Sequence, residues 1–119
     1  MGRDPFGIVS SAAAYRMQLM AYSPLDEANP LLLNGTLERT LAARHGVTTA
    51  QIALRWLAQR GVPFAVAASI PAYQRENLDV LSFALSAAEM AQLDAARTPS
   101  GCPFWPGSAC WASTCNRGV

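Results

Sequence analysis

Met20-Ala21-Tyr22-Ser23-Pro24-Leu25 is the stretch that decides the fold, because an apolar strand pattern ends there in a polar turn. The alternating run begins at Met17, and the period of two predicts a strand over residues 17–22. Pro24 has no N–H to donate and keeps the preceding residue extended, so the strand should stop before it. Ligands of α/β proteins bind where parallel strands end. Tyr22 and Ser23 therefore predict a ring for stacking and a hydroxyl for a phosphate; an ordinary strand end with a buried tyrosine is the alternative.

A second strand is predicted over residues 63–68, a short continuous apolar run typical of a strand buried on both faces. Two helices precede it. The first covers residues 37–45, with Thr36 as N-cap and Gly46 at its end, and the second starts at a capping box formed by Thr48 and Gln51. Because this long helical crossover joins the two strands, they should run parallel.

The helix that begins at Thr48 places Ile52 and Trp56 on one apolar face, which we expect a sheet to cover. Pro71 suits the first turn of a helix over residues 72–79. A further helix over 87–97 opens with a capping box of Ser86 and Glu89, and its spacing predicts Leu93 in the core and Asp94 at the rim. The order strand, helix, helix, strand, helix, helix predicts an α/β fold.

The two ends of the chain lack this regular pattern. Residues 1–16 are predicted to be irregular, with the end of a helix near residues 12–16. Residues 98–119 are predicted to form an irregular tail, which leaves residues 17–97 as the regular domain. Trp105 and Trp111 in this tail are candidates for substrate contacts if the tail folds over a pocket, and a poorly ordered end is the alternative.

Charge and cysteine content exclude several classes of function. The net charge of +1 gives no basic excess for nucleic acid, and no apolar run approaches the roughly 20 residues that span a bilayer. Three cysteines, all in the tail, make no disulfide framework, and one distant histidine gives them no complete metal site. Free thiols and the absence of a signal segment favour the cytoplasm.

Three blocks of the sequence resemble, in order and register, motifs of the aldo-keto reductase family. The blocks are Ala21-Tyr22-Ser23-Pro24-Leu25, then Ala43-Arg44-His45-Gly46 with residues 49–56, then residues 75–80 followed by Leu85-Ser86 and Glu89-Met90. The resemblance covers residues 17 to 97. It implies a fragment of a (β/α)8 TIM barrel, namely the last two βα units, with strands seven and eight, plus the C-terminal tail. The family reduces aldehydes and ketones to alcohols with NADPH.

The resemblance also implies cofactor contacts for five residues. Tyr22 would stack on the nicotinamide, Ser23 and Leu25 would lie along the pyrophosphate, and Glu76 and Asn77 would bind the adenine edge. A hydroxyl and N–H groups after a strand end suit a phosphate, and an asparagine amide can pair with adenine.

The catalytic residues of the family have no counterpart here. Its Tyr, Lys, Asp and His lie on earlier strands, whereas His45 sits at a helix end and Tyr22 belongs to the cofactor motif. The resemblance therefore implies no catalytic residue in this chain, which we expect to be inactive alone, and the carbonyl substrate cannot be deduced.

Departures from the family pattern bear on the choice of cofactor. Ala67-Ala68 stands where most members have Lys-Ser, and Tyr73 stands where many have an Arg that reaches the 2′-phosphate. The expected cofactor is NADP, with NAD left open, because these changes remove charge-assisted bonds to that phosphate. Asp26 replaces the usual Gly after the strand-end motif, so a carboxylate would repel the pyrophosphate.

Two other interpretations remain open: a truncated, non-catalytic binding or assembly module, and an incomplete gene model. Two strands alone leave unpaired edges, which predicts self-association and poor solubility.

Overall fold

The computed structural model describes residues 7–28 and 30–96 of the chain. Two strands, β1 (Ala21–Tyr22) and β2 (Phe64–Ala65), form a parallel pair in which Ala21 is opposite Phe64 and Tyr22 is opposite Ala65. The parallel arrangement and the α/β class predicted from the crossover are therefore confirmed.

Both strands are shorter than the sequence pattern predicted. β1 and β2 have two residues each, against predictions of 17–22 and 63–68. The prediction that the second strand is buried on both faces is wrong, since Phe64 and Ala65 are only half-buried. The reason is that the sheet of the described chain contains only these two strands, so little backbone is available to extend the ladder or to cover its faces.

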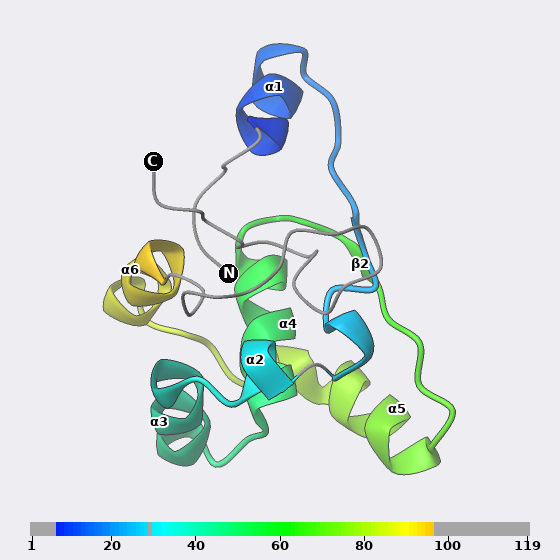
Figure 1. The fold of residues 1–119 in the computed structure, drawn as a ribbon, viewed down its shortest axis with the longest axis vertical. Helices are drawn as coiled ribbons and strands as arrows, with labels where there is room; N and C mark the ends of the chain where they lie inside the picture. Colours follow the sequence, from blue (N-terminus) through cyan, green and yellow to red (C-terminus); the bar gives the residue numbers. More distant parts are fainter. Residues whose placement is uncertain (1–6, 29, 97–119) are drawn as a thin grey trace.

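Eight helical segments account for most of the remaining described residues. They are α1 (Ile8–Ala14), η1 (Asp26–Ala28), α2 (Pro30–Leu33), α3 (Thr36–His45), α4 (Thr49–Gln59), α5 (Pro71–Leu78), η2 (Asp79–Leu81) and α6 (Ala87–Ala95). α4 lies at the centre, with α3 and α6 on one side and α5 on the other (Figure 1). Among these segments, none combines the length and apolarity required to cross a bilayer.

The segment predicted to be irregular, residues 1–16, contains a helix that starts earlier than expected. α1 follows Gly7, the N-cap, which has a φ of 65°, and the three alanines at 12–14 have high helix propensity. The helix extends away from the central helices (Figure 1). The tail predicted over 98–119, with Trp105 and Trp111, lies outside the described residues.

The predicted helix signals act as expected. The Thr48 hydroxyl accepts a bond from the Gln51 N–H at 3.2 Å, and the Gln51 Oε1 accepts the Thr48 N–H at 3.0 Å. Gly46 closes α3 at a φ of 65°, and the Val47 N–H then bonds back to the α3 backbone. The N-cap of α3 is Gly35 rather than Thr36, which is itself the first helical residue.

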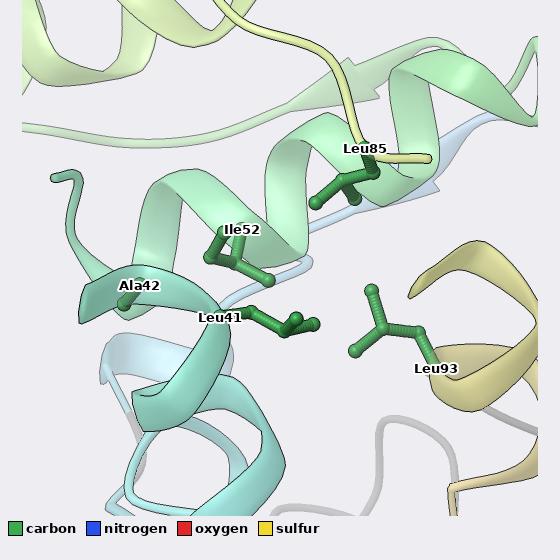
Figure 2. Packing of buried hydrophobic residues seen from close by; sticks show 5 residues of the cluster. All are labelled: Leu41, Ala42, Ile52, Leu85 and Leu93. Carbon is green, nitrogen blue, oxygen red and sulfur yellow. The ribbon is translucent and has the colours of Figure 1, made fainter. Parts of the chain in front are cut away.

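The core is made by helices rather than by the sheet. Its buried cluster joins α3, α4, α6 and the segment before α6 (Figure 2), and consists of Leu41, Ala42, Ile52, Leu85 and Leu93. Leu93 is fully buried, as its spacing predicted. The expectation that a sheet covers the face of Ile52 is wrong, because apolar side chains of α3 and α6 fill that position, and Trp56 packs partly buried beside them.

Polar side chains of α4 hold the segment that leads from α5 to α6. The Gln59 amide donates to the Leu85 carbonyl at 2.9 Å and accepts the Leu85 N–H at 2.7 Å. Two turns earlier, the Gln51 amide donates to the Glu76 carbonyl at 3.2 Å. These bonds fix α5 beside the start of α4, and this placement creates the cavity described below.

Candidate functional site

The carboxyl end of β1 presents an aromatic ring to solvent. Tyr22 is 86% exposed, so the alternative of a buried tyrosine at this strand end is wrong. The next residue, Ser23, continues the pairing with its N–H bonded to the Ala65 carbonyl at 3.0 Å. The Tyr22 ring therefore stands on a backbone fixed by the parallel strand, with one face available for stacking.

The loop after β1 has an unusual backbone. Ser23, Asp26, Glu27 and Ala28 have φ values of 48°, 46°, 56° and 62°, in the left-handed region that disfavours side chains. Each such residue costs about 1 kcal/mol or more, and such strain concentrates at ligand sites. A bond at 2.9 Å from the Asp26 N–H to the Ser23 carbonyl closes the turn. Leu25, between them, is half-buried.

The carboxylate of Asp26 in this loop has a raised pKa. Burial raises the pKa of Asp26, and the adjacent carboxylate of Glu27 raises it further. Both effects disfavour the charged form. The acidic group that the sequence placed next to an expected pyrophosphate is thus already in an unfavourable environment for a negative charge.

A shallow cavity of about 850 Å³, largely open to solvent, lies between the start of α4 and α5. Its size is in the range of small-molecule sites. The lining residues before and on α4 are neutral, and three charged side chains come from α5 and η2. The lining residues are Gly46, Val47, Thr48, Gln51, Arg75, Glu76, Leu78 and Asp79.

Local sequence explains why α5 borders this cavity. Pro71, with its fixed φ and missing N–H, begins the helix directly after Ile70. The Gln74 amide donates to the Ala68 carbonyl at 2.8 Å and so ties the first turn of α5 to the segment after β2. The Gln74–Ala68 bond and the Gln51–Glu76 bond therefore hold α5 at two positions.

The structure places the five predicted cofactor residues in two groups. Tyr22 ends β1 and Ser23 and Leu25 follow it, while Glu76 and Asn77 lie on α5, half-buried. Of these five, only Glu76 lines the cavity. The two groups are not parts of one enclosed pocket, although the pairing of β1 with β2 puts both strand ends at one edge of the sheet.

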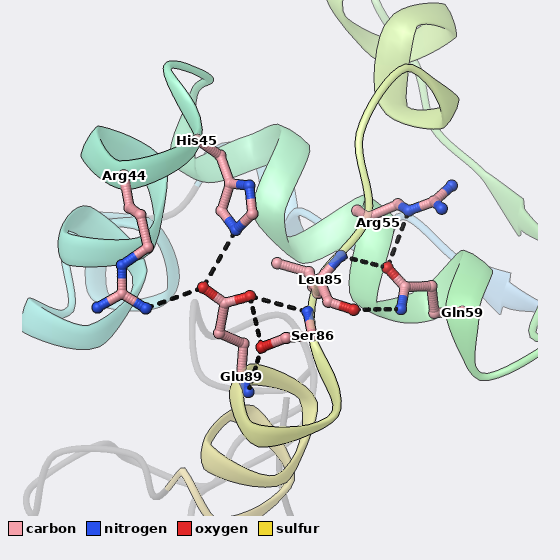
Figure 3. A network of polar contacts seen from close by, with 7 residues as sticks. All are labelled: Arg44, His45, Arg55, Gln59, Leu85, Ser86 and Glu89. Atoms are coloured by element: carbon pink, nitrogen blue, oxygen red, sulfur yellow. Dashed lines mark hydrogen bonds and ion pairs between the residues drawn. The ribbon is translucent and has the colours of Figure 1, made fainter.

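Sequence reasoning did not assign the two other charged lining residues to the site, and it missed one buried network. Arg75 and Asp79 belong to the same helical stretch as Glu76, and their spacing of four residues was the signal that could have found them. The network surrounds Glu89, whose carboxylate receives Arg44 at 3.0 Å and His45 at 3.1 Å (Figure 3). Only its bond to Ser86 was predictable from a local motif.

The Glu89 network is structural. The Ser86 backbone N–H, more than any other contact, lowers the pKa of Glu89 to about 2, and the Ser86 hydroxyl, Arg44 and His45 add to this against the opposing effect of burial. His45 is thus engaged in holding α3 to α6. In the described part of the chain, no group of three His, Cys, Asp or Glu side chains is arranged to hold a metal ion.

Comparison with known proteins gives one consistent result. The family model described as Aldo/keto reductase family matches residues 27–98. Aldo-keto reductase family 1 member A1 of Bos taurus is 36% identical over 96 residues, which are 74% of this chain and 30% of that protein. The chain therefore spans about 30% of the length of this relative.

Solved structures give the same picture. The aldose reductase of Schistosoma japonicum superposes with a TM-score of 0.65 and 31% identity, over 75% of this chain and 28% of the other. A Gox0644 mutant solved in complex with NADPH has a TM-score of 0.67 at 24% identity, over 76% and 34% of the two chains, and supports the fold.

Proposed function

This chain belongs to the aldo/keto reductase family, and from that premise we propose that it forms the C-terminal, cofactor-cradling part of an NAD(P)H-dependent reductase of aldehydes and ketones. In this proposal β1 and β2 are strands seven and eight of the barrel. The rest of the barrel completes the sheet on both sides of the β1–β2 pair. The expected compartment is the cytoplasm.

The observation that carries the proposal is the exposed Tyr22 ring at the end of a paired parallel strand. A nicotinamide is a flat aromatic ring, and stacking on a fixed tyrosine would orient it without using a hydrogen bond. The Ser23 hydroxyl and the backbone around Leu25 would follow the pyrophosphate. Glu76 and Asn77 would bind the adenine edge, with Glu76 already at the cavity wall.

The candidate site has space for the two ring systems of a dinucleotide, but the charge of Asp26 is unfavourable for its pyrophosphate. Tyr22 and the cavity of about 850 Å³ can accommodate the two rings, whereas Asp26 opposes the pyrophosphate. When bound, the nicotinamide supplies the hydride for the carbonyl carbon. The residues of this chain bind and orient the cofactor. The side chain that gives the proton to the carbonyl oxygen comes from the earlier strands of the barrel. We therefore propose that the chain alone does not turn over substrate.

An assembly module is a second candidate, favoured by the exposed apolar side chains. Ten large apolar residues are exposed in the described chain, and they include Met17, Met20 and Tyr22 along the approach to β1 and on it. Such residues on an unpaired strand favour association. Self-association through this edge would give a dimer whose formation buries Met20, and dilution would reverse it.

Titration of the full chain with NADPH, followed by cofactor fluorescence, tests the first proposal. We expect saturable binding that Tyr22→Ala weakens by about tenfold, because stacking of a base on an aromatic ring contributes roughly 1–3 kcal/mol. Tyr15→Ala is the matched control, since Tyr15 is 77% exposed and caps α1, a helix that lies apart from the central helices (Figure 1). Absence of saturable binding would refute the cradle. Turnover of a reactive aldehyde by the chain alone would refute the absence of a catalytic group.

A further inference from the structure

The charges around the α5 cavity indicate which nucleotide it accepts. We infer that the cavity selects an adenosine with a free ribose 2′-hydroxyl over a 2′-phosphorylated one, so that the cradle binds NADH more tightly than NADPH. The inference rests on the proposed function, because it needs the adenosine end of the cofactor to lie beside Glu76. It adds a selectivity, and the residues responsible for it.

The cavity lining carries more negative than positive charge. Glu76 and Asp79 are acidic and Arg75 is basic, so the formal charge of the lining is −1. Arg75 lies in the last turn of α5 and Asp79 directly follows the helix, so the one cation among the lining residues comes from the same short stretch as both carboxylates. The other lining residues are neutral: Gly46, Val47, Thr48, Gln51 and Leu78.

Carboxylates recognise the two ribose forms in opposite ways. A free hydroxyl donates a charge-assisted hydrogen bond to a carboxylate, and acidic residues hold the ribose diol in NAD sites for this reason. A phosphate monoester instead brings a charge of about −1.5 to −2 to the same place. It needs guanidinium or ammonium partners that balance this charge, and the lining offers only Arg75 against two carboxylates.

The first turn of α5 adds no side-chain cation that would offset the negative charge of the cavity lining. It contains no basic residue; Tyr73 is 53% exposed and Ala67, before the helix, is also exposed. Gln74 is engaged with the Ala68 carbonyl. The N-terminus of the helix adds roughly half a positive charge, and Pro71 removes one of its N–H donors, so the helix end alone cannot balance a dianion.

Titration of the full chain with NADH and with NADPH, which differ only in the 2′-phosphate, tests the inference by fluorescence. We expect NADH to bind about tenfold more tightly at low salt, because each unit charge at contact distance in water changes affinity about fivefold. The ratio should shrink as NaCl is added, since exposed charges are screened. Equal affinity, or tighter binding of NADPH, would overturn the inference while leaving the cradle intact; binding of neither would remove both.

Two variants assign the effect to the named residues. Tyr73→Arg adds a cation at an exposed position, so it should raise NADPH affinity by tenfold or more and leave NADH affinity unchanged. Asp79→Asn should reduce the ratio of NADH affinity to NADPH affinity, because it removes one negative charge that repels the 2′-phosphate. Equal changes for both dinucleotides in either variant would overturn the assignment, provided that circular dichroism shows the fold of that variant to be unchanged.

Discussion

Glu89 should be one of the most sensitive polar positions of the chain. Its side chain is 6% exposed, and its two oxygens serve different partners. Oε1 accepts from Arg44 and His45, while Oε2 accepts from the Ser86 N–H at 2.8 Å and the Ser86 hydroxyl at 2.9 Å. Glu89→Gln replaces one acceptor with an NH2 group. Whichever way the amide turns, a donor then faces a donor.

The magnitude follows from the pKa of Glu89, which the fold lowers from its usual 4.5 to about 2. This difference corresponds to at most about 3 kcal/mol. The Arg44 side chain is 61% exposed, so solvent screens its share, and we expect Glu89→Gln to cost about 1–2 kcal/mol at neutral pH. Because the folded-state pKa is depressed, the stabilisation is complete above pH 4.5 and disappears as the pH falls toward about 2.

Urea denaturation followed by far-ultraviolet circular dichroism measures both effects. The free energy of unfolding of the wild type should fall between pH 4.5 and about 2, and the curve of Glu89→Gln should be flatter there. Asp79→Asn, at an exposed acid outside the network, is the control and should leave the curve in place. The reasoning is refuted if Glu89→Gln matches the wild type at neutral pH, or if it retains the full acid dependence.

Three further substitutions test the packing and the backbone. Ile52→Ala empties a fully buried position, so the free energy of unfolding in urea should fall by about 2–4 kcal/mol, and a loss below about 1 kcal/mol would contradict the helical core. Gly46→Ala puts a side chain at a φ of 65° with open space around it, so a cost of about 1 kcal/mol, seen as a lower melting temperature, should come from the backbone alone. Gln59→Ala removes both bonds to Leu85, which should cost about 1–3 kcal/mol and accelerate amide exchange at Leu85, whereas the exposed Gln92→Ala should change neither.

Local signals were sufficient to predict most helix ends. The Thr48–Gln51 and Ser86–Glu89 boxes and the left-handed Gly46 depend on residues within a few positions of one another, and all three form as predicted. The start of α1 at Ile8 was missed, although the end of a helix was expected near residues 12–16, because its Ala-rich run carries no apolar period.

Non-local contacts limited the rest. The extent of β1 depends on neighbouring strands, and within the described residues only β2 is present to pair with it. Sequence periodicity showed that Ile52 faces something apolar but could not say whether that was a sheet or a helix. At the candidate site, Tyr22 and Glu76 came from motifs, while the pairing of Arg44 with Glu89 joins residues 45 positions apart.

The paired glutamine contacts of α4 fix the length of the chain between α5 and α6. Gln51 and Gln59 are eight residues apart on a rigid helix, and they bind the backbone at Glu76 and Leu85. A side-chain amide offers the same donor and acceptor as a peptide group, so Gln59 satisfies both backbone groups of Leu85. An insertion or deletion between residues 77 and 84 would break one of the two contacts. Length variation between related chains should therefore be rare in this segment, even though much of it is exposed to solvent.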